Sequence, residues 1–158
     1  MIDRLAVPKT AVDRTFEGRF ASARPRIAVL IPCCNEEFTI AGVVSQFRAE
    51  LPDAEIYVFD NNSTDCTVEK ARAAGALIFH EKRQGKGYVV QSMFRKISAD
   101  VYVMVDGDGT YPAPEVHRLI RPILTDEADI VIGSRLHRDA NSDFKTHNVS
   151  ATGSFYTS

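Results

Sequence analysis

Two aspartates separated by a single glycine, Asp106-Gly107-Asp108, are the residues of this sequence best suited to chemistry. They come directly after an apolar run at residues 101–105, where a buried strand would end. Divalent ions such as Mg²⁺ take oxygen ligands, typically one or two carboxylates together with phosphate oxygens. Gly107 would let the backbone pass close to a bound molecule. The pattern predicts a cation held by Asp106 and Asp108 beside a phosphate, although alone it also fits an aspartate-rich turn.

Three more polar clusters each follow an expected strand. Asp60, in the second cluster, could accept hydrogen bonds from a base or ribose. Alternatively it could cap the next helix, as could Ser63 and Asp65. Arg135, in the third, has a planar fork that suits a diphosphate, with a surface ion pair as the alternative. Because parallel strands end at one edge of their sheet, we expect these clusters to converge with Asp106. They lie at residues 35–37, 60–65 and 133–135, after the apolar runs 27–31, 55–59 and 128–132.

Lys86 lies between Gly85 and Gly87, where it could set a positive charge near a phosphate or form a solvated turn. The segment does not match the phosphate loop of P-loop nucleotidases, since His80 occupies the position of the first glycine. No Gly-x-Gly-x-x-Gly follows the first strand either, which argues against a dinucleotide-dependent dehydrogenase. The four histidines lack ligand spacing, and the adjacent Cys33 and Cys34 have no evident base, so neither group is expected to be catalytic.

Strands and helices alternate along the chain, which predicts an α/β domain with a mainly parallel sheet. We expect three parts: an N-terminal arm at 1–25, the folded domain at 26–138, and an irregular polar tail at 139–158. The first strand is expected to end at Pro32. The expected strands cover residues 27–31, 55–59, 76–80, 101–105 and 128–132, and the expected helices cover 38–51, 67–74, 88–97 and 115–124.

The composition is that of one ordinary globular domain. The 158 residues carry a net charge of -2, so nothing indicates a nucleic-acid partner. Three cysteines, two of them adjacent, do not form a disulfide framework and suit a reducing compartment. No apolar run approaches the ~20 residues that span a bilayer. We expect a cytoplasmic location, with the cytoplasmic face of a membrane as the alternative.

These motifs, taken in order, resemble family 2 glycosyltransferases, and in particular the dolichyl- or undecaprenyl-phosphate sugar synthases. The resemblance covers about residues 26–138 and implies the GT-A fold, a Rossmann-like three-layer sandwich. It also implies a UDP- or GDP-sugar donor, a lipid-phosphate acceptor and a Mg²⁺ or Mn²⁺ ion. The motifs that carry it are Ile31-Pro32-Cys33-Cys34-Asn35-Glu36-Glu37, Asp60-Asn61-Asn62-Ser63-Thr64-Asp65, Gly85-Lys86-Gly87, Asp106-Gly107-Asp108 and Gly133-Ser134-Arg135.

The resemblance assigns roles by position. Asp106 and Asp108 would bind the ion that bridges the diphosphate, with Thr110 as a further polar ligand. Arg135 would lie near the diphosphate or the acceptor phosphate, so that Asp106, Asp108 and Arg135 make up the catalytic set. The donor would be held by Pro32, Cys34, Glu36, Asp60, Asn61, Lys86 and Gly107.

Two alternatives to a glycosyltransferase remain at this stage. The family's domain continues beyond the length seen here, with acceptor-binding elements, so a non-catalytic nucleotide-sugar-binding module is one alternative. A nucleotidyltransferase is the other, but it would need a glycine-rich basic loop after the first strand, where Glu36 and Glu37 are acidic. An exposed sheet edge would also allow a homo-oligomer.

Overall fold

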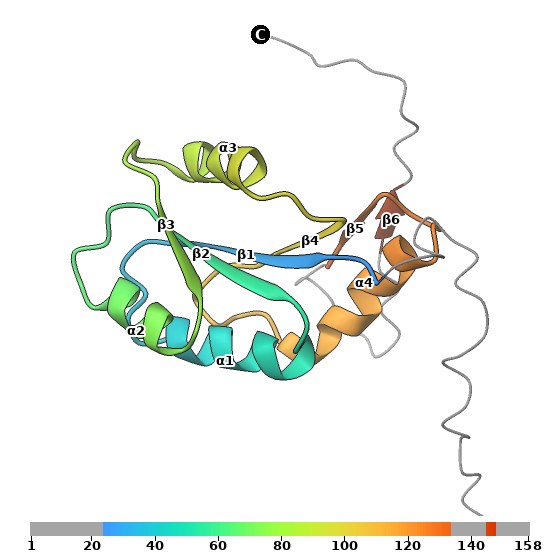
Figure 1. Cartoon of the computed structure of the whole chain (residues 1–158), viewed down its shortest axis with the longest axis horizontal. Coiled ribbons are helices and arrows are strands. Elements are labelled where there is room, and N and C mark those ends of the chain that lie inside the picture. The colour runs from blue at the N-terminus through green and yellow to red at the C-terminus, as the bar shows by residue number, and fades with distance from the viewer. Residues whose placement is uncertain (1–23, 134–144, 148–158) are drawn as a thin grey trace, which may run out of the picture.

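The computed structural model describes residues 24–133 and 145–147 (Figure 1). Its centre is a four-stranded sheet in which every neighbouring pair is parallel, in the order β3-β2-β1-β4. This order confirms the α/β class with a mainly parallel sheet. The strands are β1 (Ile27–Cys33), β2 (Glu55–Asp60), β3 (Leu77–His80) and β4 (Val101–Met104).

Helices cover both faces of this sheet, which gives the three layers expected (Figure 1). The α3 helix lies on one face, where Val89 and Met93 pack against Leu30 and Phe59. The other helices lie on the opposite face with Val29 and the rest of the larger core. No helix within the described residues combines the length and the apolar character needed to cross a membrane. The helices are α1 (Ile40–Glu50), α2 (Thr67–Ala73), α3 (Lys86–Lys96), the 3₁₀ turn η1 (Ala113–Glu115) and α4 (Val116–Leu124).

The central strand β1 is buried on both faces because helices pack on each side, and its continuous apolar run reflects this. Pro32 does not end the strand, contrary to expectation. Pairing with β4 stops at Leu30, whose carbonyl accepts from Val105 N at 3.1 Å. Peptide groups alternate sides along a parallel strand, so Pro32 faces the side of Leu30, beyond the end of β4. Its missing N–H therefore costs no ladder bond, and β1 continues to Cys33.

The fifth strand was expected in the same sheet, and this was wrong for the described residues. Instead β5 (Ile130–Ile132) pairs antiparallel with β6 (Lys145–His147) in a separate two-stranded sheet. The chain turns sharply after α4, where Asp126 has a φ of 59° and Ala128 N donates to Pro122 O at 3.1 Å. β6 also falls within the tail expected to be irregular. Its sequence, Lys-Thr-His, has no apolar period, so only backbone pairing reveals it.

Several expectations fall outside the described residues. Ser134 and Arg135 do, as does the N-terminal arm up to residue 23. The division into arm, domain and tail therefore stays a prediction, and so does self-association through a sheet edge.

Candidate functional site

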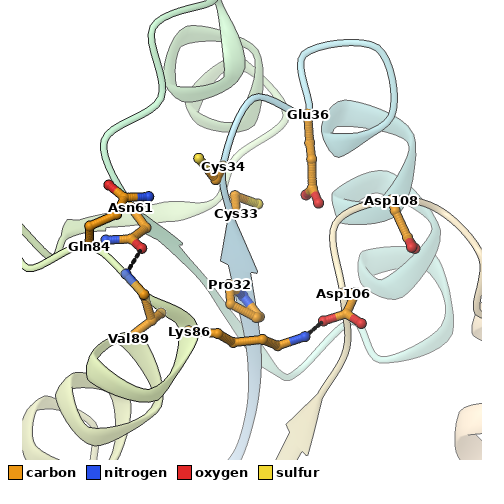
Figure 2. Close-up of a pocket in the computed structure, with 11 residues that line it drawn as sticks. Pro32, Cys33, Cys34, Glu36, Asn61, Gln84, Lys86, Val89, Asp106 and Asp108 are labelled. Carbon is orange, nitrogen blue, oxygen red and sulfur yellow. Dashed lines mark hydrogen bonds and ion pairs between the residues drawn. The ribbon is translucent and has the colours of Figure 1, made fainter.

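A cleft opens at the carboxyl ends of β1, β2 and β4, with a volume of about 350 Å³. This lies within the usual range for small-molecule sites, roughly 300–1,000 Å³. Residues from three of the four strand-end clusters, Glu36, Asn61 and Asp106, face one space in Figure 2. The fourth cluster, at 133–135, follows β5 of the separate sheet and falls outside the described residues after Gly133. The lining residues are Pro32, Cys33, Cys34, Glu36, Asn61, Gln84, Gly85, Lys86, Val89, Asp106 and Asp108.

Asp106 and Lys86 form an ion pair across the cleft, with 2.5 Å between Lys86 Nζ and Asp106 Oδ1 (Figure 2). Lys86 is the first residue of α3, so its ammonium stands at the positive end of that helix. Asp108 lies beside them, and its Oδ1 accepts from Thr110 N at 2.9 Å and Thr110 Oγ1 at 2.7 Å. Thr110 thus contacts Asp108 directly but does not line the cleft. The site offers carboxylates for a cation and an ammonium for an anion.

Glu36 is the third carboxylate in the cleft, and its Oε2 is buried without a hydrogen-bond partner among the described residues. Burial raises the pKa of Glu36, and the negative charges of Asp108 and Asp106 raise it further. The contact with the Cys33 thiol and the charge of Lys86 oppose this rise. A carboxylate in this position would gain from a nearby cation.

The Gly107 backbone packs directly against the carboxyl group of Glu36. A Cβ at position 107 would overlap Glu36 Oε2 and would stand 2.8 Å from Cys33 Sγ. Gly107 is thus required for the close passage of the chain between Asp106 and Asp108. Burial also raises the pKa of the Cys33 thiol well above its usual range, with the neighbouring Glu36 adding to the effect. Cys33 is therefore a thiol rather than a reactive thiolate, as its lack of a base suggested.

The raised pKa of Glu36 predicts a pH-dependent stability. The unfolded carboxyl ionises near its ordinary value of 4.5, whereas the folded one resists ionisation. As pH rises through this interval, wild-type protein should lose stability relative to Glu36→Gln, which cannot ionise. Urea unfolding of both proteins from pH 4 to pH 8 measures this. We expect the difference in unfolding free energy to move in favour of Glu36→Gln as pH rises. A constant difference, or one moving in the opposite direction, would contradict the assignment.

The loop that carries Glu36 is held by side chains that follow β2. The backbone N–H groups of residues 35–37 donate to Ser63 Oγ, Thr67 Oγ1 and Asp65 Oδ2 at 2.9, 2.8 and 3.2 Å. The hydrogen bond from the Thr67 hydroxyl is the main cause that lowers the pKa of Asp65, and those from the backbone N–H groups of Thr67 and Glu37 lower it further. Sequence reasoning treated Ser63 and Asp65 only as possible helix caps. They join two loops at the cleft and so set the position of Glu36.

Asp60 and Asn61 differ in their relation to the cleft. Asp60 is only 4% exposed and does not line the cleft. Its Oδ1 accepts from Ser63 N at 3.1 Å, and its Oδ2 lies 3.1 Å from His80 Nδ1. Asn61 does line the cleft, but its amide is engaged with the loop 81–85. It donates to the carbonyls of Glu81 and Arg83 at 2.8 and 2.9 Å and accepts from Gly85 N at 2.8 Å. Asn61 therefore positions the loop that leads to Lys86.

Gln84, Gly85 and Val89 also line the cleft, although the sequence analysis named none of them as a binding residue. Their closeness in sequence to Lys86 was the signal that could have identified them. For a metal, the residues in the described part of the chain include no group of three histidine, cysteine or acidic side chains that could hold an ion. Asp106 and Asp108 could bind a divalent ion together with oxygens of a ligand, as Mg²⁺ often does with a phosphate.

Comparison with known families decides which kind of protein has this cleft. The sequence pattern of Glycosyl transferase family 2 matches residues 28–157, well over half of the chain. The chain belongs to this family. The match also passes the boundary expected at residue 138, so the family pattern includes the segment that we had set apart as a tail.

Similarity to individual relatives supports the same family assignment. Protein RfbJ of Shigella flexneri is 46% identical over 122 residues, which cover 77% of this chain and 95% of RfbJ. Glycosyltransferase AglJ of Haloferax volcanii is 41% identical over 110 residues, covering 69% of this chain and 36% of AglJ. A solved structure of Mycobacterium tuberculosis glucosyl-3-phosphoglycerate synthase with Mn²⁺, UDP-glucose and phosphoglyceric acid superposes with a TM-score of 0.58 and 31% identity. That superposition covers 65% of this chain and 40% of the synthase, so the chain spans less than half of these last two relatives.

Proposed function

We propose that this chain binds a nucleoside-diphosphate sugar, from UDP or GDP, in the strand-end cleft and takes part in transfer of the sugar to a phosphate-bearing acceptor. The observation that carries the proposal is the meeting of Asp106, Asp108 and Lys86 at one edge of the sheet. A bound diphosphate is stabilised by a cation that carboxylates hold and by the ammonium group of a lysine. This edge of the sheet has residues of both kinds. Membership of family 2 supports the same reading.

Asp106 and Asp108 would hold Mg²⁺ or Mn²⁺, with Thr110 as a further polar ligand. Such an ion stabilises the negative charge that develops on the leaving nucleoside diphosphate. Support comes from the Mycobacterium tuberculosis synthase, which has been solved with Mn²⁺ and UDP-glucose and with Mg²⁺ and UDP. The buried Oε2 of Glu36, which has no hydrogen-bond partner among the described residues, would favour a cation on the same side of the cleft.

The remaining residues bind and orient the donor. Lys86 is free to turn from Asp106 to a phosphate oxygen once a cation neutralises that carboxylate. Pro32, Cys34 and Val89 offer apolar and soft surface to the nucleoside. Arg135, from its position after β5, would provide a second positive charge for the diphosphate or for the acceptor phosphate.

For the acceptor we propose a polyprenyl phosphate, on the order and spacing of the motifs in residues 26–138. Phosphoglyceric acid, present in the synthase structure, is also a phosphate monoester. An ionised phosphate oxygen could attack the sugar without a separate general base. Transfer assays with polyprenyl phosphate and with phosphoglycerate, run in parallel, separate these acceptors. Donor binding without transfer to either would favour the non-catalytic binding module.

Donor binding predicts a thermal shift that depends on metal. Because a ligand that binds only the folded state stabilises it by mass action, a donor at about 100 times its Kd should add about 2.7 kcal/mol. We expect UDP- or GDP-sugars to raise the Tm with Mn²⁺ present and to raise it less with EDTA. If no nucleotide sugar changes the Tm under either condition, the proposed function is wrong.

A further inference from the structure

Gln84 lies at the end of the cleft away from Asp106 and Asp108 (Figure 2). Its side-chain amide is hydrogen-bonded to the side-chain amide of Asn62. Asn62 Nδ2 donates to Gln84 Oε1 at 2.9 Å and to the backbone carbonyl of Lys82 at 3.1 Å. Gln84 lines the cleft, whereas Asn62 does not. The pair therefore connects the backbone of one loop to the surface that a ligand would meet.

The orientation of both amides follows from one backbone group. A carbonyl oxygen can only accept, so the Lys82 carbonyl requires Asn62 to turn its NH₂ group toward it. The second hydrogen of that NH₂ group then points to Gln84, which must offer its oxygen. As a result, the NH₂ group of Gln84 takes no part in its hydrogen bond with Asn62. Among residues 24–133 and 145–147, Gln84 Nε2 has no hydrogen-bond acceptor.

This arrangement is built into the fold. Asn62 has a φ of 63°, a left-handed conformation that asparagine tolerates better than most residues. The loop that carries Gln84 is fixed independently by the buried amide of Asn61, which bonds to Glu81, Arg83 and Gly85. The donor of Gln84 is thus preorganised at one end of the cleft.

We infer that Gln84 is the residue that selects the nucleobase, by donating from Nε2 to a keto oxygen of the base. The inference rests on the proposed function, in which the carboxylate end of the cleft takes the diphosphate and the opposite end takes the nucleoside. Uracil and guanine carry a keto oxygen where cytosine and adenine carry an amino group. A donor facing an amino group leaves both unpaired, which is costly at a partly desolvated site. The cleft therefore favours uridine and guanosine nucleotides over cytidine and adenosine nucleotides.

The test measures the Kd of UDP, GDP, CDP and ADP for the whole chain by calorimetry with Mn²⁺. Wild-type protein should bind UDP or GDP about tenfold or more tightly than CDP and ADP. Gln84→Glu presents only acceptors, so the ratio of keto to amino affinities should fall about tenfold or more. The ratio of affinities is the readout because the added negative charge of Gln84→Glu weakens the binding of every nucleoside diphosphate.

Asn62→Asp provides a second variant that leaves Gln84 in place. An aspartate accepts but cannot donate, so Gln84 would turn its NH₂ group to it and its oxygen to the cleft. We expect the same fall in the ratio, which a merely structural role of Gln84 would not produce. Gln91→Glu, the same change at an exposed position of α3 outside the cleft, should leave the ratio unchanged.

The outcomes separate this inference from the function on which it rests. If wild-type protein binds none of the four nucleotides, the proposed function fails. If it binds them but prefers CDP or ADP, or if neither Gln84→Glu nor Asn62→Asp changes the ratio, the role of Gln84 is wrong while donor binding stands.

Discussion

Gly107→Ala is expected to destabilise the fold and to abolish donor binding together. The added Cβ would overlap Glu36 Oε2 and press on Cys33, so either the Glu36 carboxyl or the segment that carries Asp106 must move. Overpacking of this kind typically costs about 1–3 kcal/mol in unfolding free energy. Because both groups that must give way line the cleft, the same displacement disturbs the cation site. Urea unfolding and titration with a nucleotide in the presence of Mn²⁺ measure the two effects.

Gly42→Ala is the matched control, since a Cβ at Gly42 in α1 meets no atom within 4 Å. That variant should keep donor affinity and gain roughly 0.5–1 kcal/mol of stability from the helix preference of alanine. Combining Gly107→Ala with Glu36→Ala should recover much of the lost stability, because the overlapping carboxyl is gone. A Gly107→Ala protein with wild-type stability and affinity would contradict the proposed close contact.

The sequence predicted the parts of the fold that depend on burial and on short-range order. The apolar runs before Asn35, Asp60 and Asp106 are strands of one parallel sheet, because helices on both faces bury them. Parallel order then brings their polar ends to one edge, and Glu36, Lys86 and Asp106 do line one cleft there. This convergence follows from topology alone, and so it was accessible without coordinates.

Two features of the structure could not be predicted from the sequence, and the physical reasons differ. The pairing of β5 with β6 depends on backbone hydrogen bonds between residues without a shared apolar pattern, so periodicity could not reveal it. The difference between Asp60 and Gln84 depends on which side-chain groups are already engaged. Asp60 contacts His80 and Ser63 beneath the surface, whereas Gln84 lines the cleft and, within the described part of the chain, uses only its amide oxygen in a hydrogen bond. Hydrogen-bond networks of this kind are set by three-dimensional contacts that spacing does not encode.

Asp106→Asn should remove the dependence of nucleotide binding on metal. The change keeps the shape of the side chain but takes one of the two proposed carboxylate ligands from the cation. Loss of a residue that only supports a metal ligand typically costs roughly 10- to 100-fold in metal affinity, so loss of a ligand should cost about a hundredfold or more. The variant also releases Lys86 from its ion pair, so binding without metal should not weaken.

Asp53→Asn provides the control, because it removes the same charge from an aspartate that is 87% exposed and remote from the cleft. The decisive measurement is calorimetric titration of UDP and GDP into wild-type, Asp106→Asn and Asp53→Asn proteins, each with Mn²⁺ and with EDTA. We expect Mn²⁺ to tighten binding to the wild-type and Asp53→Asn proteins and to leave Asp106→Asn unaffected. Equal affinities with Mn²⁺ and EDTA for the wild-type protein, or an undiminished effect of Mn²⁺ on Asp106→Asn, would contradict a cation and diphosphate site at Asp106-Gly107-Asp108.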